Sequence, residues 1–286
     1  MDQTLTPHSL VQDIGDLVTL PDVYLRISRL LDDHDSSISD IAQAVSQDPA
    51  FTLRLLRVAN SPMYRRRDSV DTVLRAVSVI GTTQIRNLAL SMSVAKCFAG
   101  LPNDVVSMDN FWRHCLLCAS IARHLAQQAG RCSADAVFTG GLLHDVGELV
   151  IFNRLPEQAH QVLELMLDSG ADLGIEKAEQ QVIGFDHCDV GGELARQWGL
   201  SSLLEECIAG HHSPAVPRQN MREVALVHLA NALAQMAEVD DLGIEDAPTI
   251  DPLVWDLTGL RESCIEPAVR EAQAGLAEIE KLFIGE

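Results

Sequence analysis

The stretch TGGLLHDVGELVIF, residues 139–152, decides how this sequence is interpreted, because it sets a polar pair, His144-Asp145, inside an apolar helical pattern. Helical geometry places these two neighbours about 100° apart on one predicted helix, so both side chains can lean toward a single ion. Glycines in the same stretch, Gly147 among them, carry no side chain and let another backbone come close. The stretch therefore predicts a buried helix that presents a histidine and an aspartate to the core.

Other histidines follow apolar helical spacing on both sides of this stretch. His114, His187 and His211 each recur with apolar residues at intervals of three or four, which predicts that they face the interior. Burying an imidazole or a carboxylate without a partner costs several kcal/mol. We therefore expect the five groups to gather around a metal or a phosphate. The alternative is that each histidine is a separate, hydrogen-bonded core residue.

The order His, His-Asp, His, His resembles the HD superfamily of metal-dependent phosphohydrolases. Two N-terminal stretches narrow the resemblance to the HDOD domain, the HD-related output domain of bacterial signalling proteins: SQDPAFTLRLLRVANS (Ser46–Ser61) and AVSVIGTTQIRNLAL (Ala76–Leu90). The resemblance covers about residues 10–215. It implies an all-α fold, a two-lobed helical bundle with an HD-domain-like C-terminal lobe, and a signalling role that does not require catalysis.

The chain departs from the catalytic pattern at two positions that bear on activity. Catalytic HD-GYP relatives read His-Asp-x-Gly-Lys, with a lysine that helps to hold a substrate phosphate, whereas this chain reads HDVGE and replaces that cation with the acidic Glu148. The closing aspartate of the superfamily, a metal ligand, matches Asn231 here. An amide oxygen binds a cation more weakly than a carboxylate and cannot neutralise its charge. The resemblance therefore implies a weakened, degenerate pocket.

Helical phasing and the resemblance together define the candidate site. Six residues are expected to line a metal or ligand pocket: His114, His144, Asp145, His187, His211 and Asn231. The expected cofactor is either one divalent transition metal (Fe, Mn, Ni or Zn) in a weakened site near His144 and Asp145, or no metal at all. If the chain is an enzyme, Asp145 and His144 are its candidate catalytic residues.

Composition limits the partners and the compartment. The net charge of −20 repels nucleic acid and anionic lipid, and no apolar stretch approaches the roughly 18 residues needed to cross a bilayer. Seven scattered cysteines and the absence of a recognisable signal peptide predict a cytoplasmic protein with reduced thiols. The basic run Arg65, Arg66 and Arg67 is a candidate contact for an acidic protein partner, and the alternative is a solvated patch.

Prolines, glycines and helix caps divide the chain. We expect an N-terminal helical lobe over residues 1–100, an HD-like lobe over 101–238, and an acidic loop with closing helices over 239–286. Asp48-Pro49 has the residue types of an N-cap and a first helical position, and it predicts a helix start. Strand-length runs of aromatic and β-branched residues are scarce, which favours helices throughout.

The sequence favours a signal-transduction output module that acts through a protein partner, with a structural or ligand-sensing pocket. The alternative is a metal-dependent phosphohydrolase acting on a nucleotide or a cyclic dinucleotide. Glu148 and Asn231 discriminate between these functions, and both favour the non-enzymatic one. The oligomeric state is left open by the sequence.

Overall fold

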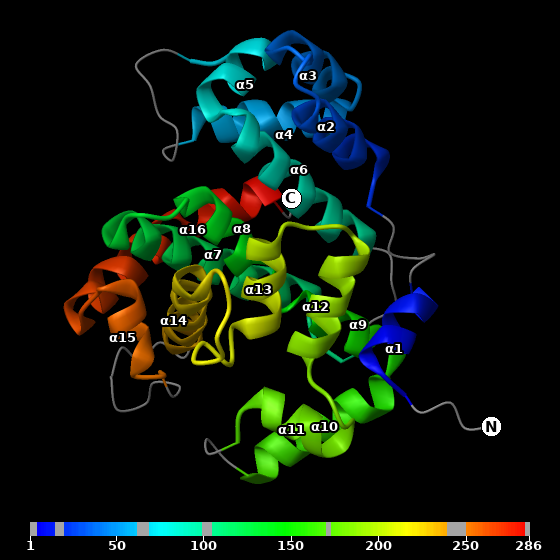
Figure 1. Ribbon diagram of the computed structural model, residues 1–286, viewed down its shortest axis with the longest axis vertical. Helices are drawn as coiled ribbons and strands as arrows, with labels where there is room; N and C mark the ends of the chain where they lie inside the picture. Colours follow the sequence, from blue (N-terminus) through cyan, green and yellow to red (C-terminus); the bar gives the residue numbers. More distant parts are fainter. Residues whose placement is uncertain are drawn as a thin grey trace. The chain divides into compact units, whose positions relative to one another are not determined.

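Every regular element that the structure describes is a helix, which confirms the predicted all-α class (Figure 1). The structure is a computed structural model that describes residues 5–14, 20–61, 69–98, 105–169, 173–238 and 250–283. None of the helices in these ranges is long and apolar enough to cross a membrane. The chain divides into two compact units, one of Met1–Leu17 and Leu101–Leu276, the other of Val18–Gly100 and Ala277–Glu286.

The unit that contains Val18–Gly100 is a cluster of helices, of which α3, α4 and α5 have side-chain N-caps. Its helices are α2 (Asp22–Asp32), α3 (Ile38–Ser46), α4 (Pro49–Asn60), α5 (Val73–Ile80) and α6 (Thr82–Phe98). Ser37 and Asp40 form a reciprocal capping box at the start of α3. Asp48 accepts a hydrogen bond of 2.9 Å from the Phe51 backbone N–H, so α4 begins at the predicted Asp-Pro pair. Within this unit α2 packs on α3 and α6, and α5 packs on α3 and α4.

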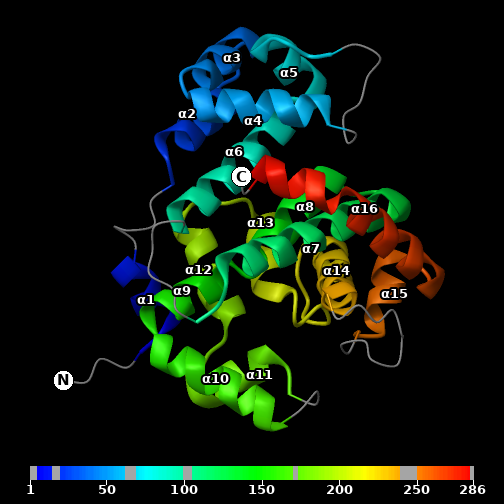
Figure 2. The same cartoon turned by 180° about the vertical axis from the view of Figure 1, so that it is seen from behind.

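The larger unit holds the predicted histidines. Its helices are α1 (Pro7–Ile14), α7 (Met108–Ala129), α8 (Ala134–Leu143), α9 (Val146–Arg154), α10 (Pro156–Ser169), α11 (Ile175–Val182), α12 (His187–Gln197), α13 (Ser202–Gly210), α14 (Met221–Glu238) and α15 (Leu253–Thr258). The last helix, α16 (Ile265–Phe283), belongs to this unit up to Leu276 and to the other unit from Ala277. Figure 2 shows α7 lying beside α14, and the two pack against each other and against α8.

The core of this unit forms around α7 and α14. Ser107 caps α7 by accepting from the Asn110 N–H, and Gly130 ends the helix with φ of 63°, a conformation that favours glycine. From Val224 to Ala237 every side chain of α14 except that of Gln235 is buried, which is the pattern of a helix enclosed by its neighbours rather than one with a solvent-exposed face. Around this pair, α8, α9, α12 and α13 pack on one another and carry the pocket.

Two glycines allow the close helix contacts that this packing needs. A Cβ on Gly141 would lie 3.0 Å from the Cα of Ala119, so α8 approaches the backbone of α7. A Cβ on Gly147 would lie 2.0 Å from the carbonyl oxygen of His187 and 2.7 Å from the backbone N of Gly191. The contact between α9 and α12 is therefore a contact of bare backbones, as the glycines in the sequence predict.

Candidate metal centre

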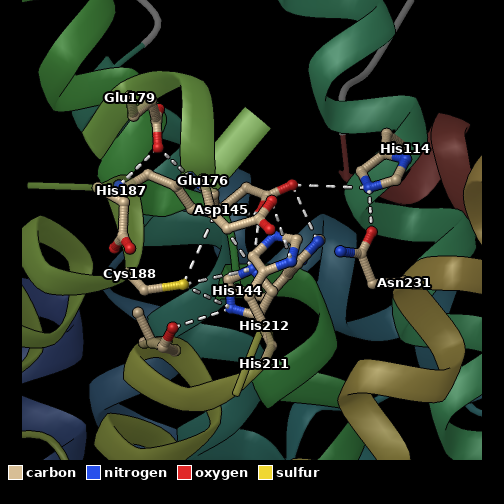
Figure 3. Close-up of polar contacts among 12 residues, drawn as sticks. His114, His144, Asp145, Glu176, Glu179, His187, Cys188, His211, His212 and Asn231 are labelled. Atoms are coloured by element: carbon tan, nitrogen blue, oxygen red, sulfur yellow. Dashed lines mark hydrogen bonds and ion pairs between the residues drawn. The ribbon is translucent and has the colours of Figure 1, made fainter. Parts of the chain in front are cut away.

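His144 and Asp145 lie at the junction of two helices. His144 is the C-cap of α8, and Asp145 is the N-cap of α9 with φ −96° and ψ 13°. The expectation that both lie on one continuous helix is therefore wrong, because the chain turns between them. Both side chains are nonetheless buried and reach the same pocket, which Figure 3 shows in close-up.

Three histidines of the pocket are held in one orientation through their Nδ1 atoms. His144 Nδ1 lies 2.8 Å from the Gly141 carbonyl oxygen, and His211 Nδ1 lies 2.9 Å from that of Ile208. His187 Nδ1 lies 2.6 Å from a carboxylate oxygen of Glu179. Because these oxygens only accept, each Nδ1 carries the proton. Each Nε2 therefore faces the pocket, where its lone pair can bind a metal in place of a second proton.

The Nε2 atoms converge on the two oxygens of Asp145. On one side, Asp145 Oδ2 lies 2.9 Å from His144 Nε2 and 3.6 Å from His114 Nε2. On the other side, Asp145 Oδ1 lies 3.3 Å from His211 Nε2 and 3.6 Å from His187 Nε2. The carboxylate thus stands between two pairs of imidazoles (Figure 3).

His114 and Asn231 meet on the Oδ2 side of Asp145. His114 extends from α7, and its Nε2 lies 3.1 Å from the amide oxygen of Asn231 on α14. Its Nδ1 lies 3.0 Å from a carboxylate oxygen of Glu238. The structure therefore brings all six predicted site residues into one connected group, with Asn231 beside His114 as the resemblance implies.

The pocket has features that fit a bound cation. Two of its buried polar atoms, His144 Nε2 and Asp145 Oδ1, make ion-pair contacts at 2.9 Å and 3.3 Å but no hydrogen bond of regular geometry. Three overlapping groups of side chains have donor atoms within 4.8 Å of one another: His114, His144 and Asp145; His187, Cys188 and His211; and Asp145, Glu148 and His187. Buried imidazole and carboxylate groups whose lone pairs face each other gain a shared partner when a divalent ion binds between them.

Charge coupling sets the protonation of the metal-free pocket. Burial alone would lower the pKa of His144, but the Asp145 carboxylate raises this pKa well above its ordinary value. Burial would raise the pKa of Asp145, and the adjacent His144 and His211 instead hold it well below its usual range. A proton on the imidazoles thus takes the place of a cation, and a metal must displace it to bind.

Glu148 occupies the position of the phosphate-holding lysine in catalytic relatives. The sequence predicts a negative charge at this position, and the structure favours the uncharged acid. Burial and the nearby Asp145 carboxylate raise the pKa of Glu148 to about 8. At neutral pH the group is therefore largely an uncharged carboxylic acid rather than an anion. In neither form does it supply positive charge to a phosphate.

Sequence reasoning missed residues that complete the pocket. Glu179 is 1% exposed and binds His187 twice, through the backbone N–H at 2.9 Å and through the ring. Cys188 lies beside the rings of His187 and His211, and these histidines lower the pKa of its thiol to about 7 against the effect of burial. Nothing in the sequence singled out Glu179. The adjacency of Cys188 to a predicted ligand was the available signal for the thiol.

A further histidine, His228 of α14, ties the pocket to the segment before α15. Its Nδ1 donates to the carbonyl oxygen of His211 at 2.6 Å, and its Nε2 accepts the backbone N–H of Asp251 at 3.1 Å. Both ring nitrogens are therefore in use, and burial lowers the pKa of this histidine. His228 positions the backbone of His211 rather than offering a lone pair to the pocket.

The predicted basic partner contact, Arg65, Arg66 and Arg67, lies outside the described residues, as does most of the predicted acidic loop. Of the loop, only the end from residue 250 is described, and the proposed arginine contact stays a prediction.

An all-helical fold with a His-Asp pair at a helix junction, ringed by histidines from neighbouring helices, defines an HD-type domain. A family model of the HDOD domain matches residues 17–214, and the chain belongs to this family. This confirms the resemblance drawn from the two N-terminal stretches and the order of the histidines.

Solved structures share the fold over nearly the whole chain. An HDOD domain protein of unknown function from Geobacter sulfurreducens is 28% identical, with a TM-score of 0.73, and the match covers 97% of this chain and 98% of that one. A candidate signal transduction protein from Marinobacter aquaeolei is 21% identical, with a TM-score of 0.73, over 96% of this chain and 61% of that one. At 21% identity, the second likeness concerns the fold alone.

One protein of similar sequence is an enzyme by name. Ribonuclease Y from Chloroflexus aurantiacus is 25% identical over 170 residues, which are 58% of this chain and 27% of that protein. The chain spans 43% of the length of a similar protein from Treponema pallidum and 27% of the length of this ribonuclease Y, so it covers less than half of either relative.

Proposed function

We propose that this chain is a signalling module that acts through a protein partner, and that its histidine–aspartate pocket holds a divalent metal in a structural or sensing role. Membership of the HDOD family and the fold shared with a candidate signal transduction protein support the signalling role. The converging Nε2 atoms and Asp145 Oδ1, which makes no hydrogen bond of regular geometry, support the metal. The partner and the metal are both part of this proposal.

The chemistry of Glu148 is the observation that supports a non-catalytic role for the pocket. Its carboxyl group lies within 4.8 Å of donor atoms of Asp145 and His187, inside the pocket. A substrate phosphate brings negative charge, and stabilising that charge in the transition state needs cations or hydrogen-bond donors fixed in place. A glutamate in the position of the lysine provides at most one neutral donor.

The first test is hydrolysis. With Mn²⁺, Fe²⁺ or Mg²⁺ supplied, we expect hydrolysis of generic phosphodiesters and nucleotides to be undetectable or very slow, because the pocket lacks a fixed cation for phosphate. Product release measured over hours by chromatography gives the result. In parallel, capture of a partner protein by the metal-loaded chain should weaken after the metal is removed with a chelator. Turnover that disappears in Asp145→Ala would replace the proposal with an enzymatic function.

The second candidate function is a metal-dependent phosphohydrolase acting on a nucleotide or cyclic dinucleotide. The convergence of imidazoles on Asp145 and the matches to ribonuclease Y favour it. In that function a divalent ion would supply Lewis-acid chemistry, held by His114, His144 and Asp145. The hydrolysis test distinguishes the two functions directly.

The asparagine at position 231 gives a second prediction. Asn231→Asp adds a carboxylate beside His114 Nε2, where the amide oxygen now lies at 3.1 Å, and should strengthen Mn²⁺ binding about tenfold or more. Titration calorimetry measures the affinity. Asn220→Asp, the same change just before α14, is the control and should leave binding unaltered. Equal Mn²⁺ affinities for Asn231→Asp and the unaltered chain would mean that position 231 does not bind the metal together with His114, His144 and Asp145.

A further inference from the structure

The first helix, α1, packs on α12 and on α9, the helices that begin at His187 and directly after Asp145 (Figure 1). The family model matches only from residue 17, and the chain that follows α1, Val18–Gly100, belongs to the other compact unit. We propose that α9 and α12 together form a docking surface for an amphipathic helix, that α1 occupies this surface, and that release of α1 loosens the contact between α9 and α12. The inference goes beyond the proposed function, because it needs neither a metal nor a protein partner.

The buried face of α1 has the spacing of a recognition helix. Leu10, Val11 and Ile14 are 2%, 1% and 0% exposed. Together with the partly buried Pro7 they occupy positions i, i+3, i+4 and i+7, the spacing by which an amphipathic helix docks on a partner. An isolated helix of 8 residues is marginal in water, so α1 depends on the surface under it to stay helical.

An ion pair sets the position of α1 along α12. His8 Nδ1 lies 2.7 Å from Glu193 Oε1, and the side chain of Glu193 is only 17% exposed. A second pair, Asp13 with Arg154 of α9, is 3.7 Å long and its side chains are 66% and 35% exposed, so it contributes little. The three buried apolar side chains therefore supply most of the docking free energy, and the pair at His8 fixes where the helix lies.

Docking of α1 adds a contact to two helices that share little side-chain surface where they meet. At their closest approach α9 presents Gly147 to the backbone of Gly191 in α12, and glycine contributes no apolar side chain there. Because α1 packs on both helices, its apolar side chains bury area that neither helix buries against the other. Asp145 precedes α9 and His187 begins α12, so loosening these helices separates two residues of the pocket.

The test uses the full chain with one substitution in α1. Val11→Asp places a charge on the buried face and should release the helix. Gln12→Asp places the same group on the exposed face and is the matched control. Hydrogen exchange followed by mass spectrometry should show the amides of α9 and α12 exchanging at least about tenfold faster in Val11→Asp, with those of α14 unchanged. Gln12→Asp should exchange as the unaltered chain does.

A fluorescent peptide with the sequence of residues 5–16 gives the second measurement. A tethered helix competes at an effective concentration on the order of millimolar. At micromolar concentration the peptide should therefore bind the Val11→Asp chain and not the unaltered chain, whose own α1 occupies the surface. Fluorescence anisotropy measures the binding, and the bound peptide should restore slow exchange in α9 and α12. A peptide that itself carries Val11→Asp should not bind.

Several results would overturn the inference. Unchanged exchange of α9 and α12 in Val11→Asp would mean that α1 does not hold these helices together. Faster exchange of α14 as well would make α1 an inseparable part of the core rather than a docked helix. Failure of the peptide to bind the Val11→Asp chain would remove the docking surface, and equal binding to the unaltered chain would place the peptide elsewhere.

Discussion

Gly147→Ala is expected to prevent α9 from packing on α12 and to lower the free energy of unfolding by more than about 4 kcal/mol. The added Cβ would lie 2.0 Å from the His187 carbonyl oxygen and 2.7 Å from the Gly191 N, and both atoms belong to backbone that no side-chain rotation can move. Because Asp145 precedes α9 and His187 begins α12, separating these helices also disperses the pocket. Urea unfolding and near-ultraviolet circular dichroism measure the loss.

Gly199→Ala is the control for this prediction. Gly199 has φ of +63°, and a Cβ there meets nothing within 4 Å. The cost should therefore be limited to the left-handed backbone, about 1–2 kcal/mol. If the two alanine variants are equally stable, the bare-backbone contact between α9 and α12 is not what holds them together.

Asp145→Asn is expected to abolish metal binding, with an affinity loss of at least about 100-fold. The carboxylate contacts all four imidazoles, at 2.9 Å and 3.6 Å through Oδ2 and at 3.3 Å and 3.6 Å through Oδ1. The amide keeps the shape of the side chain and removes its charge. Titration with Mn²⁺ and with Zn²⁺ measures the loss.

The same variant should also change how stability depends on pH in the metal-free protein. The pKa of His144 is raised by Asp145, so the pair stabilises the fold below the unfolded histidine pKa of about 6.5. That stabilisation is lost as the pH rises through the elevated folded pKa. It is also lost in acid, as the pH falls from about 3.9 through the lowered pKa of Asp145. Asp145→Asn should therefore cost most between about pH 4 and 6.5, about 3–5 kcal/mol for a broken buried pair.

Asp13→Asn offers a control of the same chemistry in α1. Asp13 pairs with Arg154 at 3.7 Å, and its side chain is 66% exposed, so the loss should stay within about 1 kcal/mol and metal affinity should not change. A pH-independent deficit in Asp145→Asn would contradict the assigned His144–Asp145 pair.

The fold class and most of the pocket could be predicted from the sequence because both depend on local patterns. Helix caps such as Asp48-Pro49 act within a few residues, and the apolar spacing around His114 and His211 determines which way each side chain faces. The resemblance then supplied Asn231, which does lie beside His114. These inferences needed no knowledge of distances between helices.

What the sequence could not provide came from helix packing. Cys188 is adjacent to His187 along the chain, but its contact with His211, 23 residues away, depends on how α12 packs on α13. The turn between His144 and Asp145 is a different case, because the run LLHDVGELV carries a helix-start signal: Asp145, a preferred N-cap residue, is followed three residues later by Glu148. The apolar periodicity continues through the run and predicts one helix where the chain turns.

The two hydrogen bonds of the His228 ring link the pocket to the segment before α15. Nδ1 donates to the His211 carbonyl oxygen at 2.6 Å, and Nε2 accepts the Asp251 N–H at 3.1 Å. Because the ring is planar and rigid, it fixes the distance between these two backbone groups. A displacement of the His211 backbone would therefore either break one of these two hydrogen bonds or move Asp251, two residues before α15, with it.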